Sequence, residues 1–199
     1  MRVGIFGGTF DPPHIGHLML AEEACSQLAL EQIFWVLTPM PPHKKGIKVS
    51  PIQDRMSMVL LAIAGNAKFR LSRVDMDRPP PHFAADTMAL LNEKSPEHQY
   101  VYIMGADSLN DLPAWHEPAR FISLCYEIGV MKRPGEKYNL SILEREFPGI
   151  KQKLLFIDTP MIGISGSDIR KRVANRENFR YFVPDKIYQF ILNHKLYVA

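Results

Sequence analysis

One stretch of the sequence decides the fold, and it reads Gly7-Gly8-Thr9-Phe10-Asp11-Pro12-Pro13-His14-Ile15-Gly16-His17. It follows a short apolar run at residues 3–6, which is typical of a buried strand that enters a tight turn at the paired glycines. From His14 onward, apolar residues recur at intervals of three and four, which indicates a helix. The stretch therefore predicts a strand, a turn rich in glycine and proline, and the start of a helix.

This arrangement favours an anion-binding site. A helix N-terminus presents unpaired backbone N–H groups and the positive end of the helix dipole, and glycines let a phosphate approach the backbone closely. His14 and His17 lie three residues apart, so they share one helix face. The spacing is neither that of the dinucleotide-binding fingerprint nor that of the Walker A loop. The alternatives are an ordinary strand-to-helix connection and a histidine pair that only caps the helix.

Length and composition indicate an ordinary globular protein with room for one domain. The 199 residues are 46% hydrophobic and 23% charged, and a net charge of +3 gives no argument for nucleic-acid binding. Cys25 and Cys125 lie far apart among apolar neighbours, which predicts buried free thiols. We find no targeting signal and no apolar run of about 20 residues, so we expect a cytoplasmic protein without membrane contact.

Short apolar runs alternate with helical patterns along the chain, which is typical of βαβ units. We expect an α/β fold of the Rossmann-like type, with an open, mostly parallel sheet, helices on both faces, and a single domain over residues 1–199. In such sheets ligands bind beyond the carboxyl ends of the strands, near the point where the strand order reverses. Strands are expected at 2–6, 32–37, 69–74, 99–104, 127–131 and 153–157, and helices from residue 14 and at 51–64, 83–92 and 184–193.

The helix expected at 51–64 has recognisable ends. Ser50 and Pro51 predict a capping box with proline at the first helical position, and Gly65 ends the helix. Trp35, inside the strand at 32–37, is expected in the core. The expected inward face of the helix consists of Ile52, Met56, Val59, Leu60 and Ile63.

Further motifs follow three of the expected strands. After 32–37, a proline-rich loop delivers Lys44, which would neutralise phosphate oxygens. After 99–104, a glycine turn places Gly105 and Asp107 where a carboxylate accepts hydrogen bonds from ribose hydroxyls, and Trp115 follows. After 153–157, segment 164–170 predicts a second helix N-terminus aimed at the same phosphates. Taken singly, the alternatives are a solvated lysine, a tryptophan that caps the core, and a capped helix start with an exposed arginine.

The ordered set of motifs is far more specific than any one of them. Together they resemble the nucleotidyltransferase superfamily named for its His-Ile-Gly-His motif, and within it the bacterial nicotinate-nucleotide adenylyltransferase family. The resemblance covers essentially the whole chain, including the helix at 184–193. It implies transfer of an adenylyl group from ATP, which carries Mg²⁺, to nicotinate mononucleotide. The products would be nicotinate adenine dinucleotide and pyrophosphate.

The resemblance also implies a role for each matched residue. His17 would stabilise charge on the α-phosphate and His14 would position it, while Lys44 and Arg170 would stabilise the departing pyrophosphate. Trp115 would stack on the nicotinate ring, near Ala84 and Thr87. No set of protein metal ligands is implied. The implied ATP-binding residues are Gly7, Gly8, Thr9, Phe10, His14, Gly16, His17, Lys44, Gly105, Asp107, Ile164, Ser165, Ser167 and Arg170.

Two positions depart from the family pattern. Gly166 replaces the middle serine of the third motif, and Ala84 stands where a threonine helps hold the nicotinate carboxylate. Nicotinamide mononucleotide therefore stays open as the acceptor. Phosphopantetheine also stays open, although its adenylyltransferase usually has threonine in place of His14. A regulator that binds nucleotides without catalysis is the remaining alternative, and the retention of His14, His17, Lys44 and Arg170 together argues against it.

Overall fold

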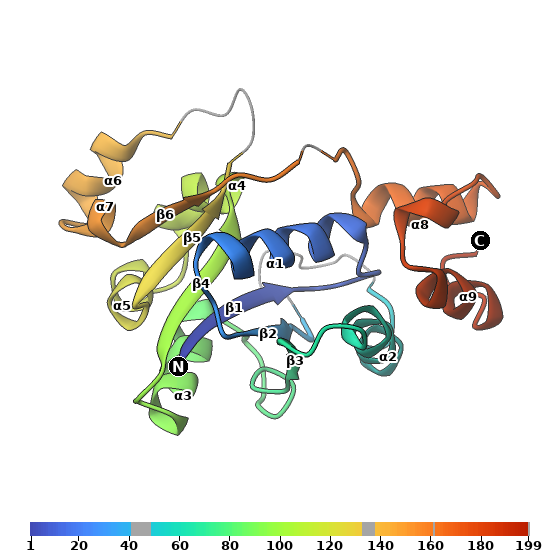
Figure 1. Cartoon of the computed structure of the whole chain (residues 1–199), viewed down its shortest axis with the longest axis horizontal. Helices are drawn as coiled ribbons and strands as arrows, with labels where there is room; N and C mark the ends of the chain where they lie inside the picture. The colour runs from blue at the N-terminus through green and yellow to red at the C-terminus, as the bar shows by residue number, and fades with distance from the viewer. Residues whose placement is uncertain (41–48, 133–137, 161, 199) are drawn as a thin grey trace.

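A parallel sheet of six strands forms the centre of the described structure. The computed structural model describes residues 1–40, 49–132, 138–160 and 162–198. The strand order is β3-β2-β1-β4-β5-β6, and every neighbouring pair is parallel. The order reverses between β1 and β4 at the centre of the sheet (Figure 1). The expected Rossmann-like α/β fold is confirmed.

The elements alternate along the chain as βαβ units require. The strands are β1 (Arg2–Gly8), β2 (Gln32–Leu37), β3 (Phe69–Ser72), β4 (Gln99–Gly105), β5 (Glu127–Met131) and β6 (Leu154–Ile157). The α-helices are α1 (Ile15–Gln27), α2 (Ile52–Ile63), α3 (Ala84–Lys94), α4 (Ala106–Asp111), α5 (Pro118–Leu124), α6 (Leu140–Glu146), α7 (Ile150–Lys153), α8 (Gly166–Ala174) and α9 (Asp185–Asn193). Two 3₁₀ turns are η2 (Leu112–Ala114) and η3 (Arg180–Phe182).

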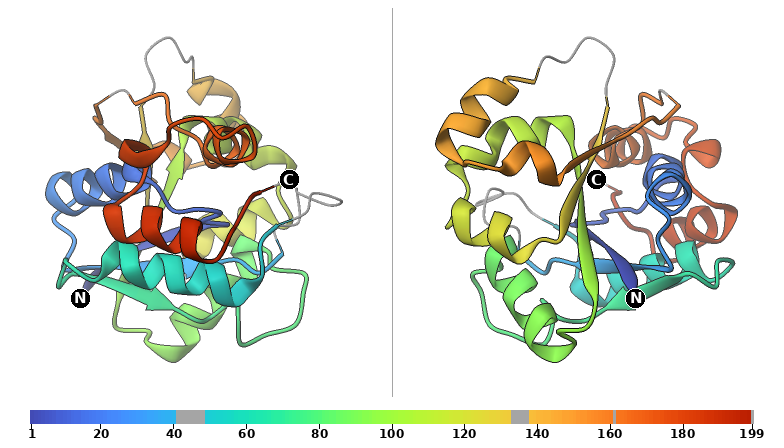
Figure 2. Two further views of the ribbon diagram at one scale, coloured as in Figure 1. Left: turned by 90° about the vertical axis from the view of Figure 1, so that its right-hand side faces the viewer. Right: turned by 60° about the vertical axis from the view of Figure 1, so that its left-hand side comes forward.

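Alternation along the strands divides the apolar side chains between two cores. Trp35 of β2 packs with α1 and α2 on one face of the sheet, whereas Val36 packs with α3 and α5 on the other. A third cluster joins α2 to α8, η3 and α9. Figures 1 and 2 show α9 beside α2 at one end of the sheet. The helices therefore cover both faces, as expected.

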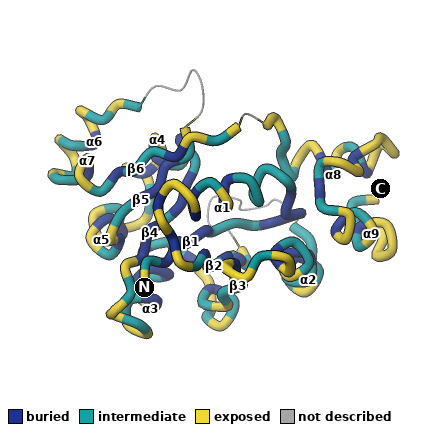
Figure 3. Tube along the Cα trace, viewed as in Figure 1, coloured by how far each residue is buried: buried dark blue, intermediate teal, exposed yellow. Residues whose placement is uncertain are grey.

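Burial agrees with the expectations for the core. Trp35 is completely buried, and Cys25 and Cys125 are buried free thiols. Figure 3 shows buried residues concentrated along the central strands and exposed residues on the outer surfaces of the helices. Within the described ranges, no helix combines the length and the apolar character needed to cross a membrane.

The first strand is longer than expected. β1 continues through Gly7 and Gly8, because both residues pair with the end of β2. The turn therefore begins at Thr9, and the expected position of the tight turn at the glycines is wrong. β3 ends at Ser72, two residues early, and the other boundaries agree with expectation or differ from it by one or two residues.

The start and the inward face of α2 also differ from expectation. Pro51 precedes the helix with no side-chain cap, and the backbone N–H of Ser50 donates to the carboxylate of Asp11 at 3.1 Å. The expected capping box is therefore wrong. Leu60 is 47% exposed and does not belong to the inward face. That face includes Arg55 and Met58 instead.

Candidate active site

A large cavity lies at the carboxyl ends of the strands, where the strand order reverses. Its volume is about 1360 Å³, and its wall includes the ends of β1, β4 and β5 and the starts of α1 and α8. Every described residue that we expected to contact ATP or the acceptor borders it. These residues are Gly7, Gly8, Thr9, Phe10, His14, Gly16, His17, Ala84, Thr87, Gly105, Asp107, Trp115, Ile164, Ser165, Ser167 and Arg170. Lys44 lies outside the described residues.

His14 and His17 lie ring against ring at the start of α1. Their ring centroids are 3.7 Å apart, and the backbone N–H of His14 donates to Nδ1 of His17 at 3.1 Å. Because Nδ1 accepts this hydrogen bond, the proton of the His17 ring resides on Nε2. His17 therefore offers an N–H donor at Nε2.

Burial determines the charge of His14. The residue is 7% exposed, and burial lowers the pKa of its imidazole to about 4. His14 is therefore neutral at neutral pH. Its Nδ1 is buried and has no hydrogen-bond partner among the described residues. The histidine pair contributes dipoles and donors to the site rather than two full positive charges.

The free energy of unfolding should decrease as the pH is lowered from 7.5 to 5, because His14 is buried in its neutral form. In the unfolded chain the imidazole binds a proton with a pKa near 6.5, whereas in the folded chain its pKa is about 4. The unfolded state therefore binds more protons between these values, which costs about 2 kcal/mol of stability at pH 5. Urea unfolding at pH 7.5 and pH 5 measures this loss. His14→Asn should lose clearly less stability than the wild type, and equal losses in the two proteins would argue against a buried neutral His14.

Phe10 borders the cavity as a buried support. The side chain is 2% exposed, and its ring packs against Phe6, Trp35 and His17 at centroid distances of 5.5, 5.0 and 5.1 Å. A Cβ at Gly8 would lie 2.8 Å from this ring, so glycine is required where Phe10 folds back over the strand end. These contacts hold the ring of His17 in place, and the contact with ATP that we expect for Phe10 stays a prediction.

The N-terminus of α8 lies next to that of α1. Ser165 caps α8: its Oγ accepts the backbone N–H of Asp168 at 3.1 Å and donates to the Asp168 carboxylate at 2.6 Å. The Ser165 hydroxyl is therefore already used within the helix cap. The first turn of α8 still contributes the positive end of the helix dipole to the cavity.

Arg170 connects α8 to the loop after β1. Its Nη1 donates to the backbone carbonyl of Asp11 at 2.7 Å, and its Nη2 lies 3.4 Å from Oγ of Ser167. A Cβ at Gly166 would lie 3.0 Å from the same carbonyl oxygen and 3.5 Å from Nη1 of Arg170. Gly166, which departs from the family pattern, therefore allows the close approach in which this hydrogen bond forms.

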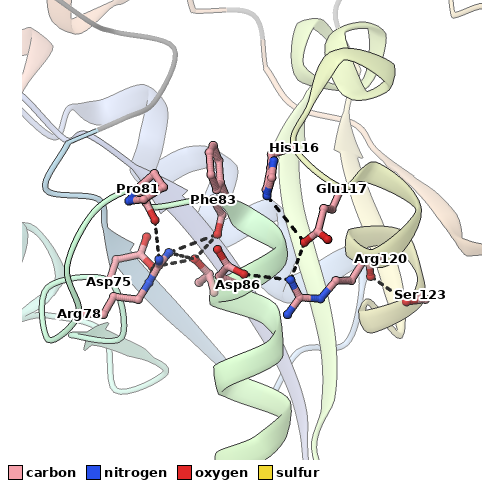
Figure 4. A network of polar contacts seen from close by, with 10 residues as sticks. Asp75, Arg78, Pro81, Phe83, Asp86, His116, Glu117, Arg120 and Ser123 are labelled. Carbon is pink, nitrogen blue, oxygen red and sulfur yellow. Dashed lines mark hydrogen bonds and ion pairs between the residues drawn. The ribbon is translucent and has the colours of Figure 1, made fainter.

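A second part of the cavity wall is aromatic and belongs to the layer of α3 and η2. The ring of Trp115 packs against Tyr102 and Phe121 at centroid distances of 6.2 and 5.2 Å. His116 stacks on Phe83 at 4.0 Å, and Figure 4 shows the two rings facing each other. Together, Trp115 and the stacked pair offer flat surfaces for an aromatic ring.

Thr87 supports this wall from inside. It is 3% exposed, and its hydroxyl donates to Oδ1 of Asp75 at 2.7 Å. Arg78 pairs with the same carboxylate oxygen at 2.9 Å and also binds the carbonyls of Pro81 and Phe83 (Figure 4). These bonds fix the loop before α3. These contacts give Thr87 a supporting role in the wall, and the direct contact with the acceptor that we expect stays a prediction.

Arg55 is a supporting residue that we did not anticipate. It is 1% exposed, and its guanidinium donates to the backbone carbonyls of Thr9, Thr38, Pro39 and Ser50 at 2.8 to 3.0 Å. It therefore joins the loop after β1 to both ends of the segment between β2 and α2. One signal was present in the sequence, because Arg55 lies one helical turn before Val59 on the inward face.

Known proteins share this fold. A family profile described as cytidylyltransferase-like matches residues 5–172. A protein from Thermomicrobium roseum named "Probable nicotinate-nucleotide adenylyltransferase" is 41% identical over 98% of this chain and 91% of its own length. A protein of the same name from Bacillus licheniformis is 36% identical over 98% of both chains.

Solved structures show the same fold. The structure of Plasmodium falciparum nicotinic acid mononucleotide adenylyltransferase complexed with NaAD has a TM-score of 0.80, at 20% identity, over 98% of this chain and 97% of that chain. The complex of the same enzyme with APC has a TM-score of 0.78. With the sequence relatives, these findings establish the family. The chain belongs to the cytidylyltransferase-like family and, within it, to the nicotinate-nucleotide adenylyltransferases.

Proposed function

We propose that the protein transfers the adenylyl group of ATP to nicotinate mononucleotide. An oxygen of the acceptor's 5′-phosphate bonds to the α-phosphorus, the bond from that phosphorus to the bridging oxygen breaks, and pyrophosphate leaves. Nicotinate adenine dinucleotide is the second product. One observation supports this most strongly: a single cavity joins the His14–His17 pair, two helix N-termini and Arg170 to an aromatic wall around Trp115. Family membership agrees with it.

In the proposed mechanism, positioning and charge stabilisation supply the catalysis. The attacking phosphate is already ionised at neutral pH, so the reaction needs no general base and no covalent intermediate. Negative charge grows on the oxygens of the α-phosphate as the new bond forms. We assign the Nε2–H of His17 as the donor to this charge, because Nδ1 is occupied by the backbone N–H of His14. The first turn of α1 would stabilise the same charge.

Two basic residues would bind the pyrophosphate part of ATP. Arg170 would pair with the β- and γ-phosphates together with Lys44. ATP enters as its magnesium complex, in which the ion is bound mainly by phosphate oxygens and water. The described ranges contain no group of three His, Cys, Asp or Glu side chains placed to hold a metal ion, so we assign no protein ligand to it.

Arg170→Ala should raise the KM for ATP and lower the turnover number, by about 10- to 100-fold in kcat/KM for ATP. The reason is that a charge-assisted contact to the leaving group is lost. Arg172→Ala is the matched control, because Arg172 lies on the same helix but contacts the Phe182 ring and the Asn178 carbonyl. Steady-state kinetics with varied ATP would measure both variants. If the two variants had the same kcat/KM for ATP, Arg170 would have no role in binding ATP.

The choice of acceptor follows from the aromatic wall. Trp115 and the Phe83–His116 pair would bind a flat pyridine ring, and Ala84 leaves the carboxylate to other donors at the start of α3. Pyrophosphate release from ATP with nicotinate mononucleotide, nicotinamide mononucleotide and phosphopantetheine as separate acceptors tests the proposal. We expect the highest kcat/KM with nicotinate mononucleotide. Activity with phosphopantetheine alone would overturn the substrate assignment.

We also propose that residues 1–199 act as one nucleotidyltransferase domain in the cytoplasm. The family match over residues 5–172 supports the domain assignment, as does the shared cluster that joins α9 to α2 and α8.

A further inference from the structure

The segment after α9 reaches the loop that begins the active site. The hydroxyl of Tyr197 donates to Oδ1 of Asp11 at 2.7 Å, across 186 positions of sequence. Asp11 lies in the loop between β1 and α1, is 5% exposed and borders the cavity. His14 follows three residues later in the same loop. The C-terminal segment therefore contacts the phosphate-binding loop directly.

Asp11 connects Tyr197 to Arg170. Its second carboxylate oxygen accepts the backbone N–H of Ser50 at 3.1 Å, and its backbone carbonyl accepts Nη1 of Arg170 at 2.7 Å. The position of Asp11 therefore sets the direction of the Arg170 guanidinium. A buried carboxylate oxygen that loses its donor stays desolvated, so the loop would move to find a new partner. Any such movement would carry Arg170 with it.

The conformation of Tyr197 shows that this contact is held in place. Its φ is 64°, in the left-handed region, which is unfavourable for a bulky residue and persists where surrounding contacts fix it. The preceding Leu196 packs against the cluster formed by α2, α8 and α9. Burial, with a contribution from the Asp11 carboxylate, raises the pKa of the Tyr197 hydroxyl. The hydroxyl therefore keeps its proton and remains a donor at neutral pH.

We propose that Tyr197 is a positioning residue for adenylyl transfer. Its hydroxyl holds the Asp11 carboxylate so that the Asp11 carbonyl directs Arg170 toward the phosphates of ATP. The inference rests on the proposed function, because adenylyl transfer is what the test measures. Tyr197 does not border the cavity and touches no reacting atom. Its side chain also hydrogen-bonds to Ser50, and we assign its effect on Arg170 to the contact with Asp11.

Tyr197→Phe tests the inference, because it removes one hydroxyl and keeps the ring. We expect kcat/KM for ATP to fall by about 10- to 100-fold. The KM for nicotinate mononucleotide should stay within about 2-fold, because the aromatic wall belongs to α3 and η2 and lacks a contact with Asp11 among the described residues. A loss of folding would lower the active fraction and leave both KM values unchanged. Tyr188→Phe is the control, since its hydroxyl makes no hydrogen bond within the described part of the chain.

A double-mutant cycle with Asp11→Asn separates a direct coupling from two independent defects. If Tyr197 acts through Asp11, the fold decrease in kcat/KM for ATP of the double variant should be much smaller than the product of the fold decreases of the two single variants. Multiplicative losses, or wild-type kinetics in Tyr197→Phe, would overturn the inference while the wild type remained active. If the wild-type protein transferred no adenylyl group, the proposed function would be wrong, and so would the positioning role of Tyr197 that rests on it.

Discussion

His17→Ala should lower the turnover number by about 10²- to 10³-fold, because the enzyme loses one preorganised donor to the charge that develops on the α-phosphate. The contacts that orient the Nε2–H of His17 include the N–H of His14 at Nδ1 and the edge-on ring of Phe10. The KM for ATP should change by less than about 5-fold, because in the proposed site the helix N-termini and Arg170 would still bind the nucleotide. Steady-state kinetics of pyrophosphate release measures both constants.

His194→Ala is a control for the loss of an imidazole elsewhere. His194 follows α9 and stacks on Phe190, where half of its side chain is exposed. Its removal should leave the turnover number within about 2-fold of the wild type. An unimpaired turnover number in His17→Ala would remove His17 from the mechanism. A higher KM with unchanged turnover would instead assign it to ground-state binding.

Arg55→Met should lower the free energy of unfolding by about 3 kcal/mol or more. The substitution keeps an apolar side chain of similar length at a buried position and removes the guanidinium donor from four partly buried backbone carbonyls. Denaturant unfolding with a constant m-value measures the loss. Adenylyl transfer should fall as well, because the carbonyls of Thr9 and Thr38 belong to residues that border the cavity.

Arg73→Met is the matched control for this prediction. The Arg73 side chain is 56% exposed and pairs with Asp77, which is 57% exposed, so its loss should cost less than about 1 kcal/mol. If Arg55→Met unfolded at the same denaturant concentration as Arg73→Met, the four carbonyl contacts would contribute nothing measurable. Arg55 would then be a tolerated buried charge rather than a support for the site.

The fold was predictable because its determinants are local and repeated. Strands of a parallel sheet are covered on both faces, so each appears as a short apolar run between helical patterns. Element ends were less predictable, because long-range contacts set them. β1 extends through Gly7 and Gly8 because β2 pairs with them, and α2 starts without a capping box, where the N–H of Ser50 donates to Asp11, 39 positions away.

The positions of the site residues were predictable, but several of their partners were not. Motifs that follow parallel strands meet at one sheet edge, which placed His17, Arg170 and Trp115 around one cavity. A motif does not show which hydroxyls are already engaged. Ser165 caps its own helix, and Thr87 binds Asp75 from inside the wall. Such pairings depend on side chains that the sequence alone does not place together.

The most direct test of the central claim follows the α-phosphorus of ATP. The purified protein would be incubated with nicotinate mononucleotide and ATP labelled at that phosphorus, and the products would be separated. We predict that all transferred label appears in nicotinate adenine dinucleotide, with one unlabelled pyrophosphate released for each dinucleotide formed. Label released as AMP or ADP without dinucleotide, or label that stays in ATP, would contradict adenylyl transfer as the activity of this site.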